Sequence, residues 1–274
     1  MGVKSFDLDR VYQSFDAITG IDEVGRGCLA GPVVVAALTW SPSKASKEGW
    51  FSGLGDSKVL QPKQRDKLYP FILEHAMRIQ VAVVANPIID QLNILRATLH
   101  GFELVAPEQN EEIPLLIDGN QKPPTLNYAR TAVKGDSRSS AIAGAAVVAK
   151  VFRDHLMAGL DRHFPQFQFS RHKGYGTADH KKALAQFGPT AYHRKSFRPV
   201  SDFLKETCPE DEVMLATVRR APRVELEQHW VDYSQTYQSY SRAGAKRITH
   251  AFQERGLAVM PTSCKLQVSS LKAR

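Results

Sequence analysis

The chain has 274 residues, of which 43% are hydrophobic and 23% charged, and lysine plus arginine outnumber the acids by 36 to 28. This composition is close to the globular average and argues against wholesale disorder, collagen or a coiled coil. No run of about 18 apolar residues occurs, so a membrane span is not expected. The formal charge of +8 suggests a polyanionic partner, although many basic proteins bind none.

The N-terminal stretch and the cysteines indicate where the protein is located and whether its thiols are reduced. The N-terminal stretch MGVKSFDLDR lacks the apolar core of a secretion signal. Cys28, Cys208 and Cys264 are an odd and scattered set that makes a poor disulfide framework, and no CxxC pair indicates zinc. We therefore expect a cytoplasmic protein with reduced thiols.

Strands and helices alternate along the first part of the chain. The segment 24–32, with three glycines and a proline, is a tight connection between two predicted strands. The second of these strands is almost continuously apolar, which favours burial on both faces. The predicted strands are 17–23, 33–40, 79–85 and 113–118, and the predicted helices are 62–77 and 88–106.

The small side chains of residues 139–152 predict a helix that packs closely against a neighbouring element. The whole alternation predicts an α/β or mixed α+β sheet domain. Residues 209–256 combine polar residues with apolar ones at helical spacing, which predicts a helical extension, and the tail 257–274 is expected to be irregular. We thus expect one domain over residues 1–200 and an extension over 201–274.

Four acids stand out by their positions. Asp22 and Glu23 end the first predicted strand, Asp118 ends the strand of sequence IPLLID, and Asp136 lies just before the small-residue helix. Acids at the carboxyl ends of strands can converge on one crevice of an open sheet. Such a cluster, without His or Cys, favours a hard cation such as Mg²⁺ or Mn²⁺ that relieves the repulsion among the acids. A pair of such ions suits phosphoryl transfer.

Other interpretations of these acids stay open at this point. A single Asp after a strand is more often a turn former or a helix cap than a metal ligand. Asp22 and Glu23 also suggest the acid and nucleophile of a glycosidase. Adjacent strand residues point to opposite faces, however, which makes that role awkward unless a bulge intervenes.

The stretch GIDEVGRGCLAGPVVVAA at 20–37 resembles the opening motif of the type 2 ribonucleases H, the bacterial ribonuclease HII family. The resemblance covers about residues 17–200, and the Gly-Arg-Gly form of the motif resembles ribonuclease HII rather than its HIII relatives. Six further blocks follow in the family's order: DSKVL (56–60), IDGN (117–120), VKGDSRS (133–139), AKVFRD (149–154), HKGYGT (172–177) and FGPTAYHRKSF (187–197).

This resemblance implies a ribonuclease-H-like mixed sheet flanked by helices, followed by a C-terminal helical extension. It implies cleavage of the RNA strand of RNA–DNA hybrids and incision 5′ to ribonucleotides embedded in duplex DNA. The family's metal ligands map onto Asp22, Glu23, Asp118 and Asp136, which implies two-metal hydrolysis with Mg²⁺ or Mn²⁺, leaving 5′-phosphate and 3′-hydroxyl ends. No covalent intermediate is required, so we expect no nucleophilic role for Cys28.

The same resemblance implies a substrate-binding set. Gly25, Arg26 and Gly27 correspond to a ribose-sensing loop, in which glycines let backbone groups approach a 2′-hydroxyl. Tyr175 corresponds to the tyrosine that packs on the deoxyribose after the ribonucleotide. Expected phosphate contacts are Lys58, Lys150 and Arg153, with His172, Lys173, Arg194 and Lys195 as additions. We expect a monomer with hybrid or ribonucleotide-containing duplexes as its partner.

Two departures from the family pattern qualify this interpretation. Ala141 and Ala146 stand at or near positions where serines are expected, which puts secondary hydrogen bonds in doubt. Many bacterial relatives stop soon after the block that corresponds to HRKSF, whereas this chain continues through residues 201–274. This extension fits a DNA-binding helix, a partner-binding element or a solvated appendage. A non-catalytic hybrid-binding protein and another two-metal nuclease, such as a junction resolvase, are the alternatives for the whole chain. The four acids disfavour the first alternative, and the Gly-Arg-Gly loop disfavours the second.

Overall fold

The computed structural model describes residues 6–54, 60–109, 112–206, 209–222 and 242–255, together with Glu225 and His229. Contacts divide the chain into two compact units, residues 1–180 with 189–200 and residues 181–188 with 201–274. Among the helices of the described ranges, none is long and apolar enough to span a bilayer.

The first unit is built on a five-stranded mixed sheet with the strand order β3-β2-β1-β4-β5. The antiparallel strands β1, β2 and β3 form a meander, and β4 and β5 add to it in parallel with β1. The strands are β1 (Ile18–Val24), β2 (Val33–Trp40), β3 (Arg78–Val84), β4 (Leu115–Asp118) and β5 (Arg130–Ala132). The predicted mixed sheet flanked by helices is confirmed.

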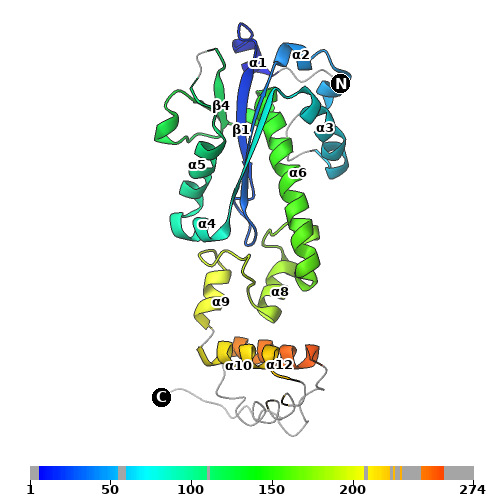
Figure 1. Ribbon diagram of the computed structural model, residues 1–274, viewed down its shortest axis with the longest axis vertical. Coiled ribbons are helices and arrows are strands. Elements are labelled where there is room, and N and C mark those ends of the chain that lie inside the picture. The colour runs from blue at the N-terminus through cyan, green and yellow to red at the C-terminus, as the bar shows by residue number, and fades with distance from the viewer. Residues whose placement is uncertain are drawn as a thin grey trace. The chain divides into compact units, whose positions relative to one another are not determined.

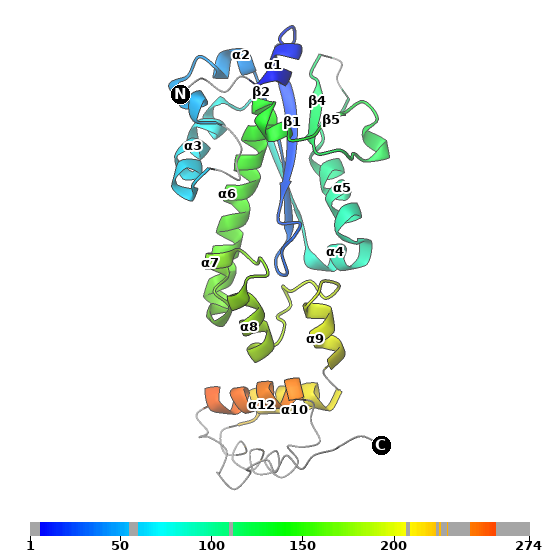
Figure 2. The same cartoon turned by 180° about the vertical axis from the view of Figure 1, so that it is seen from behind.

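Helices cover both faces of this sheet (Figures 1 and 2). One core lies between the sheet and α3 (Pro62–His75) with α6 (Ser140–His163). The other lies between the sheet and α4 (Asn86–Leu92) with α5 (Ile94–Val105). Because both faces are covered, every residue of β2 is buried, as its apolar sequence predicts. Short helices complete the unit: α1 (Asp7–Val11), α2 (Pro42–Ala45), α7 (Phe169–His172), and the 3₁₀ turns η1 (Gly49–Gly53), η2 (Pro124–Leu126), η3 (Gly135–Ser137) and η4 (Pro165–Phe167).

The small-residue helix packs closely against the sheet, as expected. A Cβ added to Gly20 of β1 would lie 2.2 Å from the backbone nitrogen of Ile142 and 2.3 Å from the carbonyl carbon of Ala141. Only a glycine therefore allows β1 to rest directly on the backbone of α6. Ala141 is completely buried at this contact, which leaves no room there for a larger side chain.

Two sequence predictions differ from the structure. The single helix predicted over 88–106 is wrong, because Asn93 adopts φ 69° and separates α4 from α5. The Asn93 side chain accepts hydrogen bonds from the backbone N–H groups of Leu95 and Arg96, so it caps the second helix. Strand β5 was not predicted, since its three residues are too short to carry a period-2 pattern.

The second unit contains helices. α8 (Ala178–Phe187) contributes its last turns, and α9 (Val200–Glu206), α10 (Pro209–Arg220) and α12 (Arg242–Glu254) follow. A small core forms between α10 and α12. Its residues include Leu215, Val218, Ile248 and Phe252, which are among the helically spaced apolar residues of the predicted extension. Val213, another of these apolar residues, is 67% exposed. The tail predicted to be irregular, 257–274, lies outside the described residues.

The Arg255 guanidinium closes the end of α10. It donates to the carbonyls of Val218, Arg219 and Ala221 at 2.8–3.1 Å, which satisfies acceptors that a helix C-terminus leaves unpaired.

Candidate active site

Two of the four predicted acids lie side by side at the carboxyl ends of parallel strands. Ile21 of β1 pairs with Ile117 of β4. Asp22 and Asp118 follow these residues directly, so the parallel register gives them equivalent positions on neighbouring strands. Asp22 is 4% exposed, and Asp118 is partly buried.

The third acid, Asp136, reaches this place through the turn after β5. Lys134 adopts the left-handed conformation, φ 54°, and starts η3. The N–H of Gly135 then donates to Asp118 Oδ1 at 2.7 Å, which ties the turn to the end of β4. Asp136 is 5% exposed beside it.

Mutual repulsion dominates the electrostatics of this cluster. The pKa of Asp22 is raised well above its usual range, first by burial and then by the negative charges of Glu23, Asp118 and Asp136. These three acids are therefore close enough to Asp22 to destabilise its charged form. All four predicted metal-ligating carboxylates thus belong to one electrostatic cluster.

The cluster fits a hard divalent cation by its donor set, which consists of carboxylate oxygens only. In the described ranges, no three Asp, Glu, His or Cys side chains converge tightly enough to hold an ion as they stand. Several carboxylates bond local donors instead. Asp22 Oδ1 accepts from the N–H of Glu23 at 2.7 Å, and Glu23 Oε1 pairs with Arg26 at 3.2 Å.

A pocket of about 260 Å³ opens beside the acids. It brings together residues that lie more than 150 positions apart in the sequence. The lining residues are Asp22, Glu23, Val24, Gly25, Arg26, Gly27, Ala146, Lys150 and Tyr175. Apart from Val24 and Ala146, each of these belongs to the predicted site. Ala146, where a serine is expected, presents only a methyl group to the pocket.

Backbone hydrogen bonds connect the glycine loop to two later segments. The N–H of Leu29 donates to the carbonyl of Gly174 at 2.8 Å, next to Tyr175. On the other side, the N–H of Arg194 donates to the carbonyl of Leu29, also at 2.8 Å. The loop 24–32 is thus held between the segments that carry Tyr175 and Arg194.

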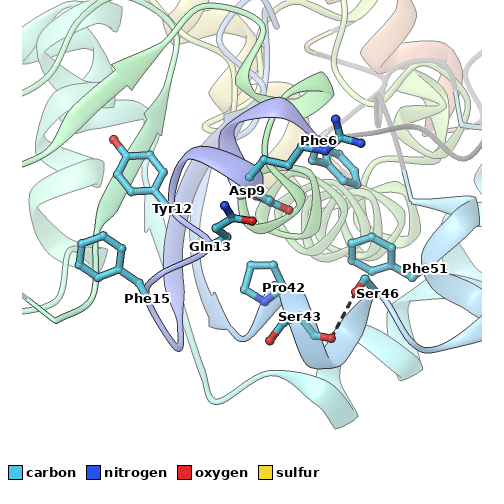
Figure 3. A pocket seen from close by; sticks show the side chains of 10 residues that line it. Phe6, Asp9, Tyr12, Gln13, Phe15, Pro42, Ser43, Ser46 and Phe51 are labelled. Atoms are coloured by element: carbon cyan, nitrogen blue, oxygen red, sulfur yellow. Dashed lines mark hydrogen bonds between the residues drawn. The ribbon is translucent and has the colours of Figure 1, made fainter.

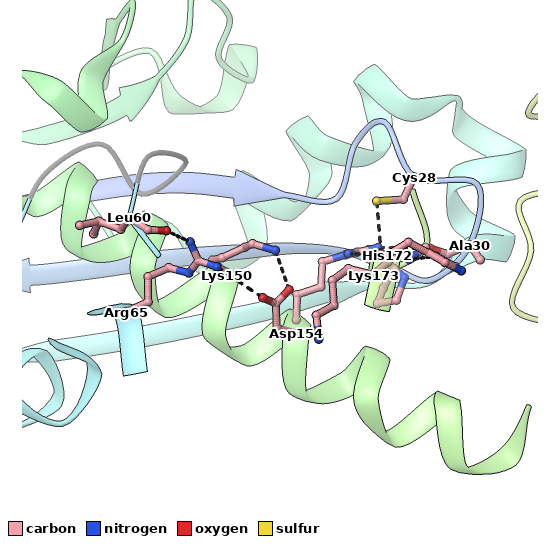
Figure 4. Close-up of polar contacts among 11 residues, drawn as sticks. Cys28, Ala30, Leu60, Arg65, Lys150, Asp154, His172 and Lys173 are labelled. Atoms are coloured by element: carbon pink, nitrogen blue, oxygen red, sulfur yellow. Dashed lines mark hydrogen bonds and ion pairs between the residues drawn. The ribbon is translucent and has the colours of Figure 1, made fainter. Parts of the chain in front are cut away.

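Lys150 and Arg26 are the basic residues among those that line the pocket. The Nζ of Lys150 donates to Asp154 Oδ1 at 2.6 Å, and the second oxygen of Asp154 lies 3.8 Å from Arg65 of α3 (Figure 4). Arg65 also donates to the carbonyl of Leu60. Asp154 and Arg65 were not predicted as site residues, although the i, i+4 spacing of Lys150 and Asp154 is a signal that sequence analysis can use.

The structure does not bring Arg153 into the pocket. Its side chain is fully buried, and it donates to the carbonyls of Ala30, Pro32 and Lys173 at 2.8–3.2 Å. Arg153 therefore holds the glycine loop through the carbonyls of Ala30 and Pro32, and it does not line the pocket. Arg194, a suggested phosphate contact, is equally buried, and burial lowers its pKa to about 10, so it stays charged at neutral pH.

A chain of neutral histidines lies behind Tyr175. The N–H of Thr190 donates to His193 Nδ1 at 2.9 Å, so the ring proton of His193 is on Nε2. His193 Nε2 then donates to His180 Nε2 at 3.0 Å, and His180 Nδ1 donates to the carbonyl of Tyr175 at 2.8 Å. Burial is the main cause that lowers the pKa of His180 to about 4 and of His193 to about 3. Sequence analysis missed this chain, because its donors and acceptors meet only in the folded molecule.

The other predicted residues lie in different surroundings. Lys58 lies outside the described residues. His172 stacks on His180 with ring centroids 4.4 Å apart, and Lys173 directs its carbonyl to Arg153. The backbone N–H of Lys195 is held by Asp90. Cys28 is buried, and burial raises the pKa of its thiol, which suits an unreactive cysteine.

A separate cavity of about 370 Å³ lies between α1 and the start of α2 (Figure 3). Phe6, Tyr12, Phe15 and Phe51 contribute to its wall. Its Asp9 carboxylate accepts from the N–H of Ser140 at 3.2 Å, which caps the start of α6. None of the predicted site residues lines this cavity.

The fold is shared with the crystal structure of the ribonuclease H2 from Pyrococcus horikoshii OT3. The TM-score is 0.54 at 21% sequence identity, and the match covers 68% of this chain and 96% of that one. A likeness at this identity establishes the fold, which is that of the type 2 ribonucleases H.

Sequence comparison identifies the family. The model of the family described as Ribonuclease HII matches residues 19–200. The ribonuclease HII of Chlamydia muridarum (strain MoPn / Nigg) is 43% identical over 203 residues, which are 73% of this chain and 91% of that protein. That of Chloroflexus aurantiacus (strain ATCC 29364 / DSM 637 / Y-400-fl) is 42% identical over 202 residues, 73% of this chain and 95% of that protein.

The chain belongs to the ribonuclease HII family. It is a ribonuclease H, an endonuclease that acts on the RNA of RNA–DNA hybrids, in a family that depends on divalent metal ions. The predicted family and enzyme class are confirmed.

Proposed function

We propose that this enzyme incises 5′ to ribonucleotides embedded in duplex DNA as well as within longer RNA–DNA hybrids, by two-metal hydrolysis that leaves 5′-phosphate and 3′-hydroxyl ends. One observation carries the proposal. A single pocket combines the acids of β1 with the Gly25–Gly27 loop and Tyr175, which are the parts that hydrolysis and sugar recognition require.

Asp22, Glu23, Asp118 and Asp136 are the proposed metal ligands. The raised pKa of Asp22 supports this role, because a cluster of mutually repelling carboxylates gains stability when a cation joins it. Divalent ions held there would supply Lewis acidity and a stabilising charge for phosphodiester hydrolysis. The four carboxylates would hold these ions, and the ion pair with Arg26 holds the Glu23 side chain at the pocket.

The Gly25–Gly27 loop is the proposed ribose sensor. Gly25 has φ 94°, and its missing Cβ leaves space that Arg153 occupies. Backbone N–H and C=O groups in such a loop can recognise a 2′-hydroxyl, which donates and accepts hydrogen bonds. Tyr175 is 41% exposed and presents its ring at the same pocket, where it would pack on the deoxyribose that follows.

Among the residues that the structure describes, Lys150 is the one that we propose contacts a phosphate of the substrate. One of its three N–H groups is directed to Asp154. Within the described residues the other two have no protein acceptor, so they can meet a phosphate oxygen. We further propose that residues 1–200 form the catalytic domain, and the family match over residues 19–200 supports this. Lys58 stays a prediction.

The first test uses a DNA duplex that contains one ribonucleotide. With Mg²⁺ or Mn²⁺ we expect a single cut 5′ to the ribonucleotide, and with EDTA no cut. The all-DNA duplex of the same sequence is the control. A folded, nuclease-free preparation that leaves the ribonucleotide strand intact in both metals would refute the incision activity.

The second test concerns the metal ligands. Asp118→Asn is expected to lower the cleavage rate by at least about a thousandfold, because a neutral amide binds a hard cation poorly, while hybrid binding survives. Cleavage rates and hybrid affinity are measured in parallel. The exposed Asp66 of α3 offers a matched control, Asp66→Asn, which should cleave like the unchanged protein. Near-normal cleavage by Asp118→Asn would contradict the two-metal assignment.

A further inference from the structure

Arg194 is bound to the glycine loop by its whole guanidinium group. Its Nη2 donates to the carbonyl of Gly25 at 2.6 Å, and its Nη1 donates to that of Arg26 at 2.7 Å. Its Nε and Nη2 both donate to the carbonyl of Gly31, at 3.0 and 2.9 Å. One buried cation therefore gathers three carbonyls of the loop at a single point.

These bonds fix the orientation of two peptide groups. In a trans peptide the C=O and the following N–H point in opposite directions. When the carbonyls of Gly25 and Arg26 turn toward Arg194, the N–H groups of Arg26 and Gly27 turn away from it. Across the described part of the chain, neither of these two N–H groups has a protein acceptor, and both residues line the pocket.

The charge and shape of Arg194 suit this task. It is fully buried, and its N–H groups form a rigid planar fork that a lysine or glutamine cannot reproduce. Its guanidinium also lies over the ring of Phe197, with 5.0 Å between Cζ and the ring centroid, which limits its freedom to rotate. Backbone bonds of Arg194 and Gly31 anchor the same segment.

We propose that Arg194 is a positioning residue for sugar recognition: it turns the Gly25 and Arg26 peptide groups so that the N–H groups of Arg26 and Gly27 face the 2′-oxygen of the substrate. This inference rests on the proposed ribose-sensing function of the loop. Arg194 itself does not touch the substrate. Its effect is transmitted through two peptide planes.

The experiment compares affinities for two duplexes that differ in one 2′-hydroxyl. The full chain is titrated in Ca²⁺ with a duplex that has one ribonucleotide and with its all-DNA counterpart, and gels verify that the strands stay intact. The ratio of the two dissociation constants measures sugar recognition alone. Arg194→Lys should reduce this ratio about tenfold, and Arg194→Gln about as much, since either change leaves loop carbonyls without their donor.

A matched control separates positioning from general damage. Arg65 is also a buried arginine that donates to a backbone carbonyl, but it lies on α3, where its partners include Leu60 and Asp154. Arg65→Lys should lower the thermal midpoint and keep the affinity ratio. If Arg194→Lys keeps the ratio of the unchanged protein, or Arg65→Lys loses it equally, the positioning role is wrong. If the unchanged protein does not prefer the ribonucleotide duplex, the proposed sugar sensor itself fails.

A measurement on the unchanged protein tests the proposal even when the Arg194 variants do not fold. The Arg194 guanidinium protons should exchange slowly with water in NMR spectra, with couplings across hydrogen bonds to the carbonyl carbons of Gly25 and Arg26. Adding the ribonucleotide duplex should shift the amide signal of Gly27 more than the all-DNA duplex does. Rapid guanidinium exchange, or equal shifts with both duplexes, would overturn the proposal.

Discussion

Asp22 is a side chain whose position serves chemistry at the expense of stability. It is almost fully buried at the end of β1, and the negative charges of three other acids surround it. A buried carboxylate in such a place raises the free energy of the folded chain when no cation is present. Active sites commonly contain groups of this kind, whose removal stabilises the fold and destroys the activity.

This conflict predicts the outcome of Asp22→Asn. The amide keeps the shape and the acceptor for the N–H of Glu23 but removes the charge, so the unfolding free energy in EDTA should rise by about 1 kcal/mol while cleavage is lost. Chemical denaturation at pH 8 measures the change.

The same substitution at an exposed acid serves as the control. Asp7 pairs with Arg138 at 2.9 Å, and this partner lowers the pKa of Asp7. Asp7→Asn should therefore lower stability slightly, opposite in sign to the change at Asp22. A destabilised Asp22→Asn protein in EDTA would show that repulsion among the acids is not the dominant effect.

The contact between β1 and α6 is the element-scale feature that sets the position of the site. β1 carries Asp22 and Glu23, and α6 carries Lys150 to the same pocket. Their backbones touch at Gly20, where even a methyl group would overlap Ile142 and Ala141. The distance between the acids and Lys150 thus depends on a contact that small residues make possible.

Substitution of Gly20 tests this contact. Gly20→Ala should lower the unfolding free energy by about 3 kcal/mol, because backbone atoms on both sides must move to admit the new Cβ. Gly159 lies on α6 with open space around its Cα, so Gly159→Ala should instead add about 1 kcal/mol through helix propensity. Urea unfolding of both proteins gives the comparison, and a Gly20→Ala protein as stable as the unchanged one would contradict the packing argument.

At the scale of the molecule, the first unit brings together the loop 24–32, the segment that carries Tyr175 and the segment that carries Arg194. The histidine chain connects the last two of these segments. His193 and His180 connect Thr190 to the carbonyl of Tyr175 and are neutral in the folded chain. In the unfolded chain each would bind a proton near pH 6.5. The stability of this arrangement consequently depends on pH.

The sign of this pH dependence is set by how many protons the folded and unfolded chains bind. The folded pKa values are about 4 and about 3, so below about pH 6.5 the unfolded chain binds more protons and the unfolding free energy falls with falling pH. Each histidine contributes up to about 1.4 kcal/mol per pH unit in this window, which ends near the folded pKa. Asp9 and Asp22 oppose this trend, because their folded pKa values are raised.

A comparison of variants isolates the histidines from these acids. Denaturation between pH 5 and 8 should show a smaller slope of the unfolding free energy against pH for His193→Gln than for the unchanged protein. Equal slopes in the two proteins would rule out the histidine contribution.

Much of the fold and site is predictable from local sequence. The apolar run 33–40 gives β2 its bounds, and the predicted mixed sheet follows from the alternation of strands with helices. The acids at the strand ends and the ordered motif blocks point to the family without any coordinates. These features are local because strand periodicity, chain order and residue type are properties of short segments. Asn93 escaped prediction, since its positive φ interrupts an otherwise continuous helical pattern.

Tertiary structure alone decided which way the basic residues point. Sequence spacing places Lys150 and Arg153 on one helix, but Lys150 lines the pocket and Arg153 lies buried under the loop. Arg194 and the histidine chain are likewise explained by partners far away in the sequence. The physical reason is that a buried polar group needs hydrogen-bond partners, and the identity of those partners is fixed only when distant segments meet.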